Sequence, residues 1–193
     1  MTTKRSPAIV AFHDGVQAAG EGPLWQAIQD NHRHNRLLWD EEDLARRKSV
    51  PDAEIAKNKR NIDGFNQKRN DAIERIDEAL LGSLESVAHR PGVRLSSETA
   101  GGMIDRLSIL SLKIRSMRLQ TERTDVDQAH LDSCKAKLER LIEQRDDLAR
   151  CLDRLLDEAA RGESYFKVYR QFKMYNDPAL NPAIYGEAKD RKA

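Results

Sequence analysis

Polar residues recur on the face of one predicted helix where apolar side chains are the rule. Between residues 51 and 88, apolar residues form a single stripe when successive positions are placed ~100° apart: Ile55, Ile62, Ile73, Ile76 and Leu80. Asn66 and Arg69 lie in the middle of this stripe, with Lys59 and Asp77 beside it and Asn70 a little further out. Each unmet polar group inside a protein costs roughly 1–3 kcal/mol. The stripe therefore predicts that Asn66 and Arg69 are largely buried and face acids from another helix. The group would be either an ion network that fixes helix register or a binding site.

A second predicted helix, from about residue 23 to 47, carries a similar face. Asn35, Trp39, Glu42 and Arg46 follow one another at spacings of four, three and four. Glu42 and Arg46 alone would be an ordinary surface pair, which contributes only ~0.2–0.5 kcal/mol. Trp39 lies on the same charged stripe, and tryptophan is usually buried or found at interfaces. This combination favours a face that contacts a ligand or another helix.

The start of a third predicted helix combines glycines with charged residues. Glu98 and Asp105 share one face, and Arg106 and Lys113 lie beside it. Gly101 and Gly102 each cost about 1 kcal/mol relative to alanine inside a helix, so close approach by another backbone or by a ligand is expected there. A frayed helix end is the alternative.

Together these faces predict an interior site for a small anionic ligand. Arg69, Arg106 and Lys113 would hold its anionic groups, because guanidinium and ammonium groups bind phosphate and carboxylate. Glu42, Asp77, Glu98 and Asp105 would orient it, act as acid or base, or carry Mg²⁺ as a candidate cofactor. Asn35, Trp39, Asn66 and Asn70 complete the predicted set, and we assign no dedicated metal ligands.

Four long helices and no strand are expected to position these residues. Proline and glycine delimit them, giving helices over about 23–47, 51–88, 97–122 and 125–161. Ser96 or Ser97 is the expected cap of the third helix and Thr124 or Asp125 that of the fourth. Gly162 can end the fourth helix in the left-handed conformation. The expected organisation is a lead-in over 1–20, one domain over 21–185 and a tail over 186–193.

The third and fourth predicted helices carry an apolar seam with coiled-coil-like spacing. The seam consists of Met103, Leu107, Leu110, Ile114 and Met117 on one helix and Leu131, Cys134, Leu138, Leu141, Leu148, Leu152 and Leu155 on the other. Arg145 is the one position where the seam becomes polar. This spacing predicts an antiparallel hairpin within an all-α bundle.

Composition narrows the function classes. Lys and Arg (33) nearly balance Asp and Glu (32), for a net charge of +1, which argues against a nucleic-acid binder with a global positive field. No apolar run could span a bilayer or form a signal-peptide core. Cys134 and Cys151 are expected to be reduced thiols, and the expected location is the cytoplasm. A homo-oligomer is compatible with this composition.

Residues 165–175 interleave aromatic and basic side chains. Such a segment could stack on single-stranded nucleic acid. We favour packing of its aromatic side on the bundle, with Lys and Arg directed outward.

Four stretches of the chain resemble a bacterial domain-of-unknown-function family over about residues 25–185. They are Asn35-x-x-x-Trp39-x-x-Glu42-Asp43-x-x-Arg46, Lys59-Arg60-x-Ile62-Asp63-x-x-Asn66-Gln67-x-Arg69-Asn70-Asp71, Glu98-Thr99-x-Gly101-x-x-Ile104-Asp105-Arg106-Leu107-Ser108 and Phe172-Lys173-Met174-Tyr175-Asn176-Asp177. The resemblance implies an all-helical fold and a gene context near glycosyltransferases of surface-polysaccharide clusters. It implies no established activity.

The sequence therefore leads to an expected function as a binder of a phosphorylated or nucleotide-linked sugar, with catalysis left open. One alternative is a non-catalytic interaction protein that docks a glycosyltransferase. Another is a Mg²⁺-dependent enzyme like the helical nucleotide pyrophosphohydrolases, because Glu74-x-x-Asp77 and Asp40-x-x-Asp43 resemble their paired acids. A solvent-reachable pocket would favour binding over a closed structural network.

Overall fold

Five helices make up most of the described structure: the four long ones that the sequence predicts, and a short helix within the predicted lead-in. The computed structural model describes residues 5–171, 174 and 177–183. Its elements are α1 Ser6–His13, α2 Pro23–Leu44, α3 Asp52–Gly82, β1 Arg94–Leu95, α4 Ala100–Thr121, α5 Gln128–Ala160 and β2 Ser164–Tyr165. None of the described helices has the length and apolar character needed to cross a membrane.

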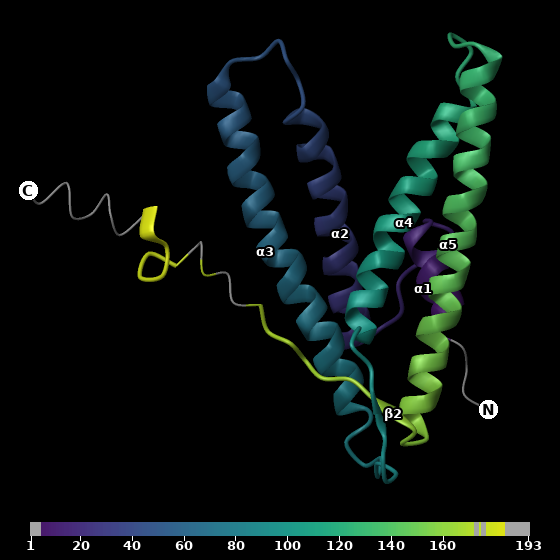
Figure 1. Ribbon diagram of the computed structural model, residues 1–193. Helices are drawn as coiled ribbons and strands as arrows, with labels where there is room; N and C mark the ends of the chain where they lie inside the picture. Colours follow the sequence, from purple (N-terminus) through teal and green to yellow (C-terminus); the bar gives the residue numbers. More distant parts are fainter. Residues whose placement is uncertain (1–4, 172–173, 175–176, 184–193) are drawn as a thin grey trace, which may run out of the picture.

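The four long helices form two pairs that diverge from a common base (Figure 1). α2 packs against α3, and α4 packs against α5. α2 and α4 both begin at the base, and their far ends are splayed apart, so the four helices do not stay together along their whole length (Figure 1). The predicted partnership of the third and fourth long helices is present, whereas the coiled-coil character of their seam stays a prediction.

The caps of α4 and α5 lie two to three residues beyond the predicted ones. Thr99 caps α4 by accepting a hydrogen bond from Gly102 N at 3.0 Å, and Asp127 caps α5 by accepting one from His130 N at 2.8 Å. Ser96 does not cap α4, because its hydroxyl group instead donates a hydrogen bond to the carbonyl oxygen of Glu98 at 2.8 Å. The predictions of Ser96 or Ser97 and of Thr124 or Asp125 were therefore wrong.

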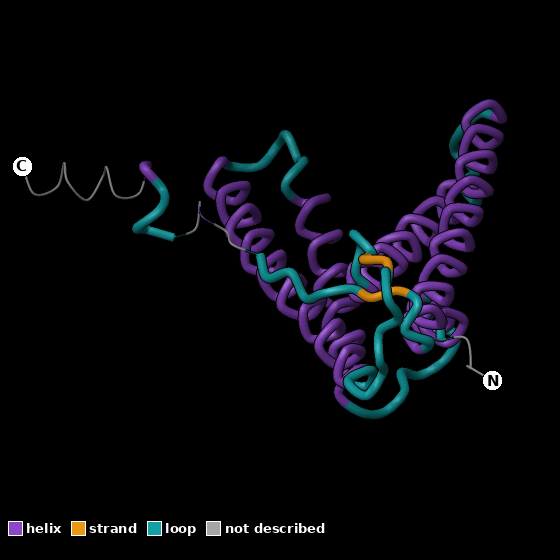
Figure 2. Tube along the Cα trace, turned by 60° about the horizontal axis from the view of Figure 1, so that its bottom comes forward, coloured by secondary structure: helices purple, strands orange, loops and turns teal. Residues whose placement is uncertain are grey.

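One short sheet was not predicted. β1 and β2 pair in parallel, with Arg94 opposite Ser164 and Leu95 opposite Tyr165 (Figure 2). Strands of two residues are too short to carry the apolar–polar alternation that reveals strands in a sequence. Gly162, with φ of 67°, makes the turn that leads from the end of α5 into β2.

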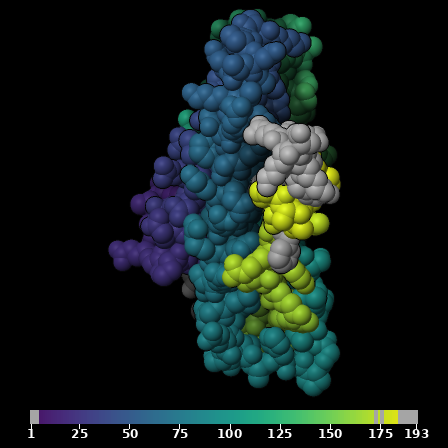
Figure 3. Space-filling model, turned by 90° about the vertical axis from the view of Figure 1, so that its left-hand side faces the viewer, coloured from purple at the N-terminus to yellow at the C-terminus, as the bar shows by residue number. Residues whose placement is uncertain are grey.

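After β2 the chain crosses from the base onto the outer surface of α3 (Figure 3). The Arg170 guanidinium binds Glu74 at 3.2 Å and Glu78 at 2.7 Å. Phe166 is buried and Arg170 is exposed, as expected for aromatic residues packed inward, but Tyr169 is 57% exposed. Phe172, Lys173, Tyr175 and the predicted tail over 186–193 lie outside the described residues.

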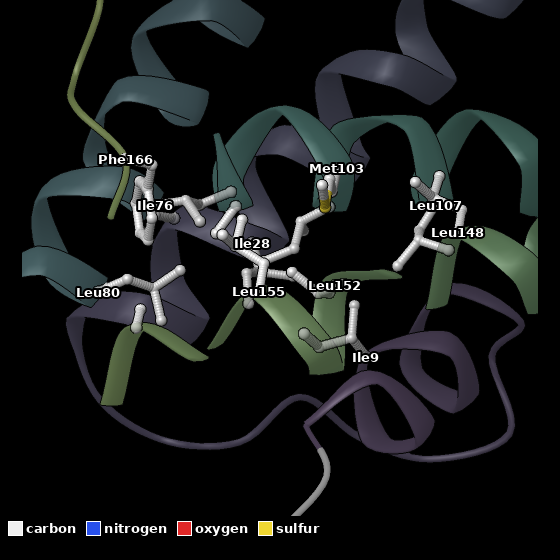
Figure 4. Packing of buried hydrophobic residues seen from close by; sticks show 14 of the residues in the cluster. Ile9, Ile28, Ile76, Leu80, Met103, Leu107, Leu148, Leu152, Leu155 and Phe166 are labelled. Atoms are coloured by element: carbon white, nitrogen blue, oxygen red, sulfur yellow. The ribbon is translucent and has the colours of Figure 1, made fainter. Parts of the chain in front are cut away.

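The hydrophobic core occupies the base (Figure 4). Every helix and the segment after β2 contribute side chains to it: Ile9, Ala27, Ile28, Ile76, Leu80, Ala100, Met103, Ile104, Leu107, Leu110, Leu148, Leu152, Leu155, Ala159 and Phe166. Burying one such side chain contributes roughly 1.5–3 kcal/mol. The core therefore fixes α2 beside α4, and the polar residues of these helices meet directly above it.

Candidate functional site

A layer of polar side chains joins α2 to α4. Asp105 of α4 is buried, and its Oδ1 accepts hydrogen bonds from Asn31 Nδ2 at 2.8 Å and Asn35 Nδ2 at 2.9 Å. Asn35 Nδ2 also lies 3.0 Å from the hydroxyl oxygen of Ser108. Asn31 and Ser108 are fully buried. A carboxylate removed from water is stable only when hydrogen bonds and charge replace its hydration, and the two amides supply the hydrogen bonds.

Arg69 of α3 supplies the opposite charge. Its Nε is 4.0 Å from Asp105 Oδ1, and its side chain is 27% exposed. The same Nε is buried without a hydrogen-bond partner in the described part of the chain. One terminal nitrogen contacts Asn70 Oδ1 only at 3.5 Å. Arg69 was expected to be buried and to face an acid from another helix. It does face one, but it is half-buried and its hydrogen-bonding capacity is largely unused.

A pocket of about 300 Å³ opens between α2, α3 and α4 next to Arg69. Its lining combines apolar, aromatic and charged groups: Asn35, Leu38, Trp39, Glu42, Asp43, Arg46, Asn66, Arg69, Ile109 and Leu112. Within the pocket wall, the Glu42 carboxylate binds Arg46 at 2.8 Å. Five predicted site residues therefore line one pocket: Asn35, Trp39 and Glu42 on α2, and Asn66 and Arg69 on α3. Asp105 contacts two of them, Asn35 and Arg69.

Two predicted acids have other partners. Asp77 is buried, and its Oδ1 accepts a hydrogen bond from Gly101 N at 2.6 Å, so it holds the first turn of α4. A Cβ at Gly101 would lie 2.6 Å from the carbonyl oxygen of Ile73, which confirms the expected close approach of another backbone. Glu98 precedes α4 and binds Arg106 on the surface at 2.6 Å.

Three further predicted residues also lie away from the pocket. Arg106 and Lys113 are exposed on α4, so the expectation that they share the interior was wrong. They lie on the side of α4 that turns away from α2, because the buried Asp105 and Ser108 define the inner face. Asn70 is buried and donates through Nδ2 to Gln171 Oε1 at 2.7 Å, fastening the segment after β2 to α3.

Burial shifts the pKa of three groups near this layer. It raises the pKa of Asp77 to about 6, against the opposing effect of hydrogen bonds from Thr99 and Gly101. It lowers the pKa of His13 to about 3 and that of His32 to about 4. The two imidazoles stack with ring centroids 4.8 Å apart, and the repulsion between their charges further lowers the pKa of His13. Both histidines are therefore neutral at neutral pH.

Among the residues that the structure describes, no group of three or more His, Cys, Asp or Glu side chains is arranged so that it could hold a metal ion. Glu74 and Asp77, one of the acid pairs noted in the sequence, serve other contacts: Glu74 binds Arg170 and Asp77 holds the start of α4.

Asn31 and Ser108 belong to the polar layer but were not predicted. The sequence contains a usable indication of both, because Asn31 lies four residues before Asn35 and Ser108 three residues after Asp105. Residues at these spacings share a helix face. A single Asn or Ser in a helix does not by itself indicate a site, and only the packing of α2 against α4 brings these two residues together.

The comparisons with known proteins give one result. Residues 25–168 match the model of a family described as "Protein of unknown function (DUF4254)". No curated protein and no solved structure matches the chain. Because the matched segment runs from the start of α2 past the end of β2, it includes the whole polar layer and pocket, and the chain belongs to the DUF4254 family.

Proposed function

We propose that the pocket between α2, α3 and α4 binds a phosphorylated or nucleotide-linked sugar. The observation that carries this proposal is Arg69, a half-buried guanidinium on the pocket wall whose terminal nitrogens make only one long hydrogen bond in the described chain, of 3.5 Å to Asn70. A donor pair in this position fits a phosphate oxygen, because guanidinium binds phosphate with two parallel hydrogen bonds. Asp105 keeps the arginine in place from behind.

The other side chains of the pocket suit the sugar. Trp39 offers a large ring with an apolar face, against which the C–H groups of a sugar can pack. Glu42 offers carboxylate oxygens and Asn66 an amide group for hydroxyl groups, whereas Asn35 offers only its amide oxygen, because its nitrogen donates to Asp105. A volume of about 300 Å³ corresponds to a small ligand or to one part of a larger one.

The family resemblance also guides the choice of ligand. Genes of this family are expected near glycosyltransferases, whose donors are nucleotide-linked sugars. A protein that only docks such an enzyme would not need an open pocket with an under-used arginine. Binding is therefore the better supported role, and Mg²⁺ enters through the phosphate groups of the ligand when it is present.

Thermal unfolding with sugar phosphates and nucleotide sugars, with and without Mg²⁺, tests the proposal. A ligand at 100 times its Kd should stabilise the protein by about 2.7 kcal/mol. Trp39→Ala and Arg69→Gln should each weaken binding by about tenfold or more, since each removes about 1.4 kcal/mol or more of contact. Arg106→Gln is the matched control, because Arg106 is exposed and outside the pocket.

Two results would reject this function. One is the absence of stabilisation by every sugar phosphate and nucleotide sugar tested. The other is a ligand whose affinity falls equally in Arg106→Gln and in Arg69→Gln. Trp39→Ala keeps the test informative if Arg69→Gln unfolds, because Trp39 does not neutralise Asp105.

A further inference from the structure

A second and larger cleft, of about 940 Å³, lies on the opposite flank of α2 from the pocket. The C-terminal end of α1, the outer face of α2 and the far half of α4 line it. The two cavities have Leu112 in common, but none of the charged residues of one lines the other. The cleft is therefore distinct from the pocket to which the function above is assigned.

Four exposed arginines line this cleft. Arg33 and Arg36 come from α2, and Arg115 and Arg118 from α4, each pair three residues apart on its helix. Across the described chain, none of the four has a carboxylate within ion-pair distance, whereas most other described arginines do. All four side chains are exposed, so water screens the repulsion between them and their charges are accessible to an anion.

The acids of the cleft do not neutralise these arginines. Asp14 binds Arg145 at 2.7 Å, and Asp30 binds Arg75 at 2.8 Å, so the charges of both are already balanced. Asp40 and Glu122 are the remaining carboxylates of the lining. Four guanidinium groups against two free carboxylates leave an excess of positive charge in a concave site, where low-dielectric walls strengthen the field.

Buried histidines add a second observation. His13 lines the cleft and is 6% exposed, and both of its ring nitrogens lack a hydrogen-bond partner in the described chain. It stacks on His32, whose Nδ1 lies 2.8 Å from the Ser108 hydroxyl oxygen. An unpaired polar ring at the end of a cationic cleft is costly without a ligand or an ordered water to complete it.

We propose that this cleft is a separate binding site for a diphosphate group, with the arginines of α2 and α4 holding the two phosphates from opposite sides. An arginine pair on each of two helices can bind the oxygens of two adjacent phosphates with forked hydrogen bonds. A single phosphate has too few oxygens to use the donors of both pairs. Phe12, Leu37 and Leu119 also line the cleft and leave apolar surface for an organic group attached to the diphosphate. Inorganic pyrophosphate and a nucleoside diphosphate both carry this chemistry.

Calorimetric titration of the full chain with inorganic pyrophosphate, orthophosphate and a nucleoside diphosphate tests the site. Pyrophosphate should bind more tightly than orthophosphate, and a nucleoside diphosphate that binds still more tightly would assign the apolar surface to its organic part. The Arg115→Gln/Arg118→Gln double variant should weaken pyrophosphate binding at least tenfold. Arg140→Gln/Arg150→Gln removes the same charge from exposed positions of α5, outside the cleft, and should change the affinity less than twofold.

Three outcomes would overturn the proposal: no binding of pyrophosphate or nucleoside diphosphate, an affinity unchanged by Arg115→Gln/Arg118→Gln, or an equal loss in the α5 control. Binding of a single-stranded oligonucleotide without binding of pyrophosphate would likewise exclude a diphosphate site. Arg33→Gln/Arg36→Gln is a second variant should the α4 variant unfold. Trp39→Ala separates the two proposals, because it should weaken sugar binding and leave pyrophosphate binding unchanged.

Discussion

Asp77 illustrates how a single buried carboxyl can be essential to a helix and still be costly. It is 2% exposed, and it accepts the N–H of Gly101 that no residue inside α4 could satisfy. Burial makes its charged form unfavourable, and the nearby Glu74 adds repulsion, so the pKa rises from 3.8 to about 6. The group is then easier to protonate in the folded protein than in the unfolded chain.

The stability of the protein should therefore depend on pH through Asp77. A raised pKa means that the folded state binds more protons between pH 3.8 and about 6, so the Asp77 contribution is present below pH 3.8 and lost as pH rises through 6. Asp77→Asn keeps an oxygen for Gly101 and abolishes the titration. As pH rises from 3.8 to about 6, the free energy of unfolding of Asp77→Asn should increase by up to about 3 kcal/mol relative to that of the wild type.

Urea denaturation at several pH values measures this difference. Comparison of variant and wild type is essential, because the lowered pKa values of His13 and His32 have the opposite effect and make stability rise with pH between about 3 and 6.5. Glu78→Gln removes an exposed carboxyl from the same helix and controls for net charge. A difference between Asp77→Asn and wild type that stays constant across pH would contradict the assignment.

At the level of elements, α1 explains the polar interruption in the α4–α5 seam. Arg145 of α5 is 9% exposed and binds Asp14, just after α1, at 2.7 Å. Asp153 of α5 binds the other end of α1, through the N–H and hydroxyl of Ser6. The polar position in the seam is thus the place where the N-terminal helix joins the hairpin, and Ile9 packs into the core between these two anchors.

Removing one partner of the Arg145–Asp14 pair should lower the free energy of unfolding more than replacing both partners with uncharged residues. Asp14→Ala leaves a buried guanidinium without its partner, and such changes typically destabilise by ~3–5 kcal/mol. In the Asp14→Ala/Arg145→Met double variant no charge is left unpaired, so part of the stability should return. Chemical denaturation of both variants gives the comparison, and a double variant less stable than Asp14→Ala would refute this account of the pair.

The same elements show what a sequence can and cannot reveal. Helix positions follow from local chemistry, since Pro23 and Gly162 mark boundaries by their own backbone preferences. The grouping of Asn35, Trp39 and Glu42 follows from helical spacing, which depends on one helix alone. Arg106 and Lys113 were misplaced because the direction in which a charged face points depends on the packing of α4 against α2, and no local pattern specifies that packing. The pairing of Arg145 with Asp14 joins residues 131 positions apart, and no local pattern in the sequence predicts it either.

At the level of the whole molecule, stability should be graded from the base to the far ends. The buried residues of α5 are concentrated between Arg145 and Ala159, with Cys134 alone nearer its start. Leu119, near the end of α4, is 58% exposed. Local opening is easiest where few apolar side chains are buried.

Hydrogen exchange followed by mass spectrometry should show this gradient. Amides of α5 near Leu152 should exchange slowest, and those in its first three turns, from Gln128 onward, should exchange much faster. The loop between α2 and α3 should behave like the start of α5, since it also lies at the far end of its pair (Figure 1). Equal protection along the full length of α5 would argue against a core confined to the base.

The splayed arrangement also gives the molecule the mechanics of a pair of levers joined at a fulcrum. α2 and α4 have 22 residues each, and at about 1.5 Å per residue each arm is about 33 Å long. A rotation of only about 10° at the base then displaces the far end of an arm by about 6 Å, more than one helical turn. Both cavities have walls on the two arms, and the larger cleft reaches from Gln26 near the start of α2 to Leu119 near the end of α4, so rotation at the base would change its width most at the far end. Leverage of this kind converts slight repacking around Leu107 and Leu152 into large changes in the separation of the tips.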